Sequence, residues 1–151
     1  MLFFPKVKIK WGKIIFVSFI FLVIEMVIRN IEAFLTMKYY FMPEYFSVWS
    51  KLMMSKAGPP PAEFFVISAL FSFLSALVIA CVYECIKNSL ERGFWKRVLG
   101  FTKLMMLLML VFAYLPMYLM VNIPVALVVS WFVSGTLVVF LGAVIFVKIL
   151  K

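Results

Sequence analysis

The sequence contains no histidine and no aspartate, and only two of its 151 residues are cysteine. Without histidine, the chain lacks the commonest metal ligand, the usual haem ligand and the usual general base. Cys81 and Cys85 are four residues apart, so they do not form a CxxC redox motif, and we interpret them as small apolar fillers of one helix. The motifs GxGxxG, GxxxxGK[ST] and HExxH are also absent. These absences predict a protein without a metal, a cofactor or catalytic residues, and therefore one that is not an enzyme.

Acidic residues are scarce as well, because six glutamates stand against fifteen lysines and arginines, for a net charge of +9. Hydrophobic residues make up 67% of the chain, more than a soluble domain of this size can bury, so the expected solvent is a lipid bilayer. In a soluble protein this charge would suggest nucleic acid, but here the basic residues flank apolar runs and suit anionic lipid headgroups. We expect a single membrane domain over residues 1–151 that contacts lipids and binds no nucleic acid.

Four apolar runs are long enough to cross a bilayer, which predicts an all-α integral membrane four-helix bundle. The predicted spans are about 14–38, 63–86, 104–118 and 124–147, with the third extending back toward Val98. Eleven basic residues lie in the N-terminal segment, the second connection and the C-terminus, whereas the first and third connections hold only Lys38, Lys51 and Lys56. Because positive loops stay on the cytoplasmic side, we expect both termini in the cytoplasm and the protein in the cytoplasmic (inner) membrane.

The first connection predicts one short helix that lies in the membrane interface. Pro43 suits a first helical turn, and Gly58 followed by three prolines ends a helix. Between them Tyr45, Trp49, Leu52 and Met53 can share one apolar face, opposite polar side chains. Aromatic residues in this segment are typical of the level of the lipid headgroups.

The first span carries three charges, Glu25, Arg29 and Glu32, whose spacings of four and three place them on one helix face. A charge in hydrocarbon costs at least about 2.5–3.5 kcal/mol, so we expect the three side chains to turn inward and pair. With a rise of about 1.5 Å per residue, Glu25 lies about 18 Å beyond Lys13, just past the middle of a core about 30 Å thick. Two interpretations stay open: a solute or ion site entered from outside, and a self-neutralising Glu–Arg–Glu ladder that holds helices together.

Small residues recur on two other spans at spacings that let helix backbones approach closely. They form a row at every fourth position of the second span and a pair of glycines seven residues apart in the fourth: Ser68, Ser72, Ala76, Ala80, Gly135 and Gly142. Four spans make a thin bundle. A single helix contact inside it would use only part of the small-residue faces on the two helices. The pattern therefore predicts self-association into a homo-oligomer.

Three other patterns have ordinary explanations. Glu63 and Glu84 bracket the second span about 30 Å apart by helix rise, too far for a catalytic pair, so we place them at the interfaces. Methionines around the third span would suit copper(I), but histidine is absent and the cysteines lie at the opposite end, so they are interpreted as flexible core fillers. Serines of the second span lack a base, and helix packing explains them better than a nucleophile.

Parts of the sequence resemble known membrane protein families. Glu25 resembles the first-span glutamate of the small multidrug resistance exporters, which are shorter and less biased in charge. Arg29-Asn30-Ile31-Glu32 looks similar to the Arg-Asn-Glu arrangement of the glutathione-linked membrane enzymes, in a different span. The main likeness is to a loose group of uncharacterised four-span bacterial membrane proteins, whose shared features correspond here to Arg97–Gly100, Tyr114 or Tyr118, Asn122-Ile123-Pro124, Trp131 and Gly135. This resemblance implies a four-span fold and no particular activity.

The charged stripe sets the preferred function, because ionisable residues inside a span are function candidates. We interpret the chain as a small-solute or ion transport component whose pathway contains Glu25, Arg29 and Glu32. One alternative is a non-catalytic accessory or scaffold subunit that docks partners through its small-residue faces. Another is a lipid-active membrane enzyme, which is disfavoured because its acid–base chemistry would rest largely on glutamate. Water that reaches Glu25 would favour transport, whereas a dry bundle with an exposed small-residue groove would favour a scaffold.

Overall fold

The computed structural model describes residues 10–49, 53 and 60–150, which form helices joined by short connections. Four helical segments are long and apolar enough to cross a membrane: Trp11–Tyr40, Ala62–Ile86, Phe94–Met120 and Val125–Ile149. The described part of the chain contains no strand. The predicted all-α membrane bundle is therefore confirmed, and its physical reason is that hydrocarbon offers no partner to an unpaired backbone N–H or C=O.

The first two spans lie where the apolar runs predict them. Helix α1 (Trp11–Tyr40) extends a few residues beyond the predicted 14–38 at both ends, and α2 (Ala62–Ile86) matches the predicted 63–86 to within one residue. Helix α2 begins directly after the proline run, with the extended backbone of Pro61 as its N-cap.

The connection between them starts with a 3₁₀-helix, η1 (Pro43–Val48), in place of a longer α-helix. Pro43 occupies its first turn as the sequence predicts. Trp49 follows in an extended conformation and stacks on Tyr40 at the end of α1, with ring centroids 5.0 Å apart. The rest of the predicted interfacial helix falls on 50–52 and 54–59, outside the described residues.

The third span is a composite of α3 (Phe94–Met109), a π-helix η2 (Leu110–Tyr114) and α4 (Leu115–Met120). The predicted span was 104–118 with an extension back toward Val98, so the helix is longer than expected at its N-terminal side. The basic residues Lys96 and Arg97 led to the assignment of 94–97 to the connection, whereas a helix can keep apolar stems in lipid and charged tips at the interface. The π-helix lies just before Pro116, whose missing N–H and bulky ring disturb the preceding turn.

Helix α5 (Val125–Ile149) follows Pro124, close to the predicted 124–147. Its C-terminal carbonyls accept hydrogen bonds from two lysines: Lys13 Nζ donates to the Ile149 carbonyl (3.3 Å) and Lys87 Nζ to that of Leu150 (2.8 Å). Positive charge at this position complements the negative end of the helix dipole. We call the end of the bundle where α1 begins and α5 ends the basic end, and the opposite end the η1 end.

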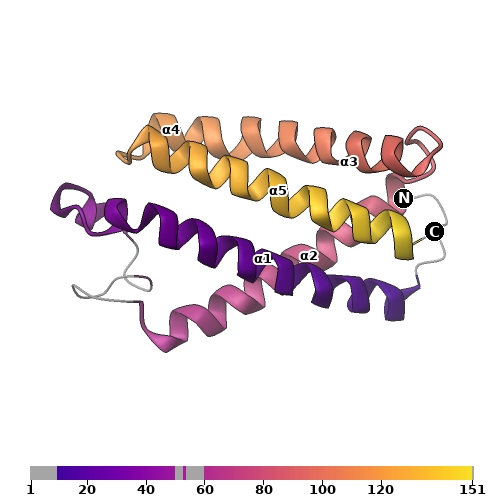
Figure 1. Cartoon of the computed structure of the whole chain (residues 1–151), viewed down its shortest axis with the longest axis horizontal. Helices are drawn as coiled ribbons and strands as arrows, with labels where there is room; N and C mark the ends of the chain where they lie inside the picture. The colour runs from indigo at the N-terminus through magenta and orange to yellow at the C-terminus, as the bar shows by residue number, and fades with distance from the viewer. Residues whose placement is uncertain (1–9, 50–52, 54–59, 151) are drawn as a thin grey trace, which may run out of the picture.

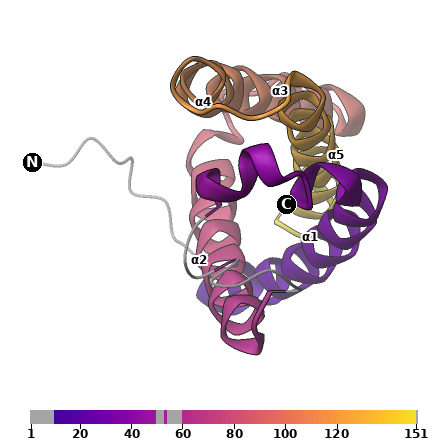
Figure 2. The ribbon, with the colours of Figure 1, turned by 90° about the vertical axis from the view of Figure 1, so that its left-hand side faces the viewer.

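The four spans form an open arrangement in which α5 packs between α1 and α3, and α2 packs against α1 (Figure 1). Helix α2 is inclined across α1. Its C-terminal part lies near α3 at the basic end, and its N-terminal part diverges from α4 toward the η1 end (Figures 1 and 2). The bundle is therefore closed more tightly at the basic end, and the inner faces of α1 and α5 lie between diverging helices at the η1 end.

A cluster of four aromatic rings fills the core toward the basic end, and each of the four spans contributes one ring. These rings, which we call the aromatic layer, have neighbouring centroids between 5.3 and 6.2 Å apart and belong to Phe21, Tyr83, Phe101 and Phe146, all at most 2% exposed. Gly142 makes room for the layer, because a Cβ at this position would overlap the Phe21 ring. Glu25 lies one helical turn beyond Phe21 toward the η1 end.

Candidate functional site

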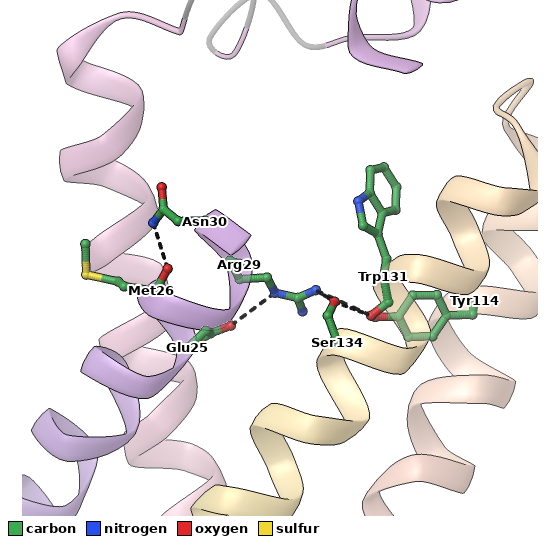
Figure 3. A network of polar contacts seen from close by, with 7 residues as sticks. All are labelled: Glu25, Met26, Arg29, Asn30, Tyr114, Trp131 and Ser134. Atoms are coloured by element: carbon green, nitrogen blue, oxygen red, sulfur yellow. Dashed lines mark hydrogen bonds and ion pairs between the residues drawn. The ribbon is translucent and has the colours of Figure 1, made fainter. Parts of the chain in front are cut away.

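Glu25 and Arg29 form a loose ion pair on α1, and Arg29 extends from there toward α5 (Figure 3). Arg29 Nε lies 3.9 Å from Glu25 Oε1, which is longer than a hydrogen bond. Ser72 of α2 lies beside the Glu25 carboxylate, yet Glu25 Oε2 is buried and has no hydrogen-bond partner among the described residues. The i, i+4 contact expected from the sequence is thus present, but the pairing of the two charges is incomplete.

Arg29 is held away from Glu25 by α5. Its Nη1 donates a hydrogen bond to Ser134 Oγ (2.9 Å) and a longer one to the Trp131 carbonyl (3.4 Å). Gly135 provides the space for this crossing, since a Cβ there would lie 3.5 Å from Arg29 Nη2 and 3.0 Å from the Tyr114 hydroxyl. The guanidinium therefore links two helices while 37% of its side chain stays exposed.

The Trp131 carbonyl is the point where three helical segments meet. It accepts hydrogen bonds from the Tyr114 hydroxyl (2.9 Å) and Ser134 Oγ (3.1 Å) as well as from Arg29. A carbonyl oxygen has two lone pairs, so the three donors share it and not all three bonds can be optimal. The π-helix η2 contains Tyr114, and its hydroxyl thereby joins the third span to the polar contacts of α1 and α5 (Figure 3).

Glu32 does not belong to the ion pair, although the spacing predicted that all three charges would pair and a continuous Glu–Arg–Glu ladder was one of the two interpretations left open. Within the described residues no cation lies in ion-pair contact with Glu32. Its Oε1 instead accepts hydrogen bonds from Ser130 Oγ on α5 (2.7 Å) and Thr36 Oγ1 (3.0 Å), and the residue is 7% exposed. The expected pairing of Glu32 with Arg29 is wrong, and with it the ladder interpretation, because Arg29 reaches across to α5 and leaves Glu32 to hydroxyl donors.

Three aromatic rings lie on the η1 side of these charges: Tyr40, Trp49 and Trp131. Their centroids are 5.0 to 6.4 Å apart, and Trp131 Nε1 donates a hydrogen bond to the Tyr40 hydroxyl (2.9 Å). The Trp131 ring points from α5 toward the η1 end (Figure 3). The rings pack directly on one another, so this η1-end aromatic cluster covers the charged residues and offers no open cage for a cation.

Most of the small residues predicted to pack helices contact other spans of the same chain. Ala76 and Ala80 are fully buried, Ser68 and Ser72 are partly exposed, and both glycines are buried against neighbouring spans. Gly142 faces Phe21 of α1, and Gly135 faces Met109 and Tyr114 of the third span. The faces through which a scaffold subunit would dock are thus largely covered. Self-association stays a prediction, and an oligomer would have to form through another surface of the protein.

At the basic end, Glu84 pairs with Lys87 (2.8 Å), while Glu84 Oε2 and Thr102 Oγ1 are buried without a hydrogen-bond partner among the described residues. Cys81 and Cys85 are free and partly buried. In the part of the chain that the structure describes, no group of three or more His, Cys, Asp or Glu side chains is placed to hold a metal ion.

Sequence reasoning missed the α5 side of the site. Ser130 and Ser134, which bind Glu32 and Arg29, were not selected as site residues, although two serines four apart on an apolar span were a usable signal. Tyr114 and Trp131 entered only through a family resemblance. No family model, characterised protein or solved structure matches this chain, so that resemblance stays a prediction.

Proposed function

We propose that the chain is a component of a membrane transport system for a small polar solute or ion, and that Glu25, Arg29 and Glu32 line its site. The observation that carries the proposal is the incomplete pairing of Glu25 and Arg29 inside a span. Charges in a membrane are costly, so a purely structural pair is expected to close into a direct salt bridge with its donors and acceptors used. In a site that binds and releases a solute, some hydrogen-bond donors and acceptors stay free for that solute.

The surroundings support a site that is reached from one side. On the basic side of Glu25 the aromatic layer fills the core with rings from all four spans. On the other side α2 and α4 diverge (Figure 2), and among the described residues the η1-end aromatic cluster packs beyond the charges. By the distribution of basic residues the η1 end is extracytoplasmic, so the proposed site faces outward in this conformation.

Solvent access to Ser72, the α2 residue beside Glu25, tests the proposal. In a background with Cys81→Ala and Cys85→Ala, Ser72→Cys should react with a membrane-impermeant, charged thiol reagent added to the η1 side of sealed vesicles. Ser75→Cys is the matched control, because Ser75 is an exposed serine less than one turn away on the same helix. Ser75 should face hydrocarbon, where the thiolate does not form and the charged reagent does not enter.

A Ser72→Cys thiol that is modified faster than the Ser75→Cys thiol, and from one side, supports an aqueous route to the charges. If the reagent modifies Ser72→Cys no faster than the control from either side, the charged residues are dry and the transport proposal fails. The remaining role would then be structural, with Arg29 as a tie between α1 and α5.

A further inference from the structure

The charges on α1 follow the order negative, positive, negative, and this order restricts what the site can bind. Arg29 lies between Glu25, at 3.9 Å, and Glu32, which follows three residues later on the same helix face. An anion that approaches Arg29 therefore meets two carboxylates nearby. A simple cation that approaches Glu25 meets the guanidinium at the same short distance. Neither ion of a single charge finds a favourable place.

The polar atoms of the site that have no hydrogen-bond partner include both donors and an acceptor. Arg29 binds Ser134 and Trp131 through Nη1, and none of the hydrogen bonds among the described residues uses its Nη2 or Nε. Glu25 Oε2 likewise has no partner there. The Nε and Nη2 edge of a guanidinium matches the two oxygens of a carboxylate, and a carboxylate oxygen matches an ammonium donor.

Resting on the proposed transport function, we infer that the site recognises a small zwitterion, a solute with one carboxylate and one ammonium group a few ångströms apart. Its carboxylate binds Arg29 and its ammonium group binds Glu25, so each charge of the protein gains an opposite partner. The solute brings no net charge into the membrane, which limits the cost of leaving water. Glu32 keeps its hydrogen bonds to Ser130 and Thr36 and lies on the other side of Arg29 from Glu25.

Four probes that share a three-carbon chain separate the charge classes: 3-aminopropanoate, propylamine, propanoate and propanamide. The full-length protein in nanodiscs of uncharged lipid is titrated with each probe, and its melting temperature is recorded at matched ionic strength. A ligand that binds only the folded state raises this temperature, and at about five times its Kd the rise should be about 2–4 °C. We expect this rise with 3-aminopropanoate and a much smaller one with the other three.

The Glu25→Gln variant provides a sharper test, because it should change the class of the ligand. Loss of this carboxylate removes the partner of the ammonium group and the nearer of the two negative charges that keep anions from Arg29. The response to 3-aminopropanoate should fall and the response to propanoate should appear. Glu91→Gln is the matched control, since Glu91 is an exposed glutamate outside the spans that pairs with Lys96, and it should respond as the wild type does.

Each outcome separates this inference from the proposed function. If propanoate or propylamine alone stabilises the wild type as well as 3-aminopropanoate does, or if no probe does, the zwitterion inference is overturned. The transport proposal still stands if Ser72→Cys is accessible to the thiol reagent, and falls if it is not. If Glu25→Gln cannot be purified folded, the four wild-type titrations decide the inference alone.

Discussion

The contact between Gly142 and Phe21 offers the most direct test of how α1 and α5 pack. In Gly142→Ala the added methyl group would overlap the Phe21 ring, which is 2% exposed and stacks on Phe146 with centroids 5.8 Å apart. Because the ring is held on both sides, the helices must separate or the ring must leave its place. Overpacking of this kind costs about 1–3 kcal/mol, which for a chain of this length lowers the melting temperature by about 2–12 °C.

Thermal unfolding in one detergent, followed by circular dichroism, measures this effect. Gly12→Ala is the matched control, since nothing lies within 4 Å of a Cβ at Gly12 and the change should be neutral or slightly stabilising. Adding Phe21→Leu should recover part of the loss caused by Gly142→Ala. If Gly142→Ala melts within 1 °C (about the precision of the assay) of the wild type, Phe21 does not occupy this space and the reasoning is refuted.

Two more predictions concern the charges and the orientation. Glu25→Gln and Arg29→Leu should each lower thermal stability by about 1 kcal/mol, because each removes the partner of a charge that is only partly exposed to water, whereas the double variant should recover much of the loss; equal melting of Glu25→Gln and wild type would contradict the ion pair of Glu25 with Arg29. In a chain with Cys81→Ala and Cys85→Ala, an impermeant thiol reagent outside whole cells should label Asn122→Cys in the exposed turn before α5 but not Ser89→Cys in the exposed turn after α2; the reverse pattern would invert the proposed topology.

The sequence predicted the spans well because the position of a span depends on the summed hydropathy of its own residues. A run of apolar residues is stable in a bilayer whatever its neighbours are, so α1, α2 and α5 begin and end within a few residues of their predicted bounds. The third span was predicted too short, since Lys96 and Arg97 lower the summed hydropathy at its start and make this stretch resemble a loop. Their apolar stems can remain on a helix at the end of the bundle, and this depends on where the helix lies in the membrane.

The charged site was only half visible in the sequence. Residues four apart on a helix are neighbours in any fold, so the contact of Glu25 with Arg29 followed from spacing alone. By spacing alone Arg29 could also meet Glu32, but Ser134 and the Trp131 carbonyl of α5 offer the guanidinium partners that no spacing on α1 could reveal.

The sequence by itself determined that the chain is a four-span membrane protein with a charged stripe on one helix, because both properties are local. Tertiary structure alone decided which helices meet, since many small residues permit close packing but a single Phe21 ring fills the space at Gly142. It also decided how far Glu25 and Arg29 are neutralised. That depends on atoms from α2, α5 and the third span, which lie far away in the sequence and come together only when the bundle forms.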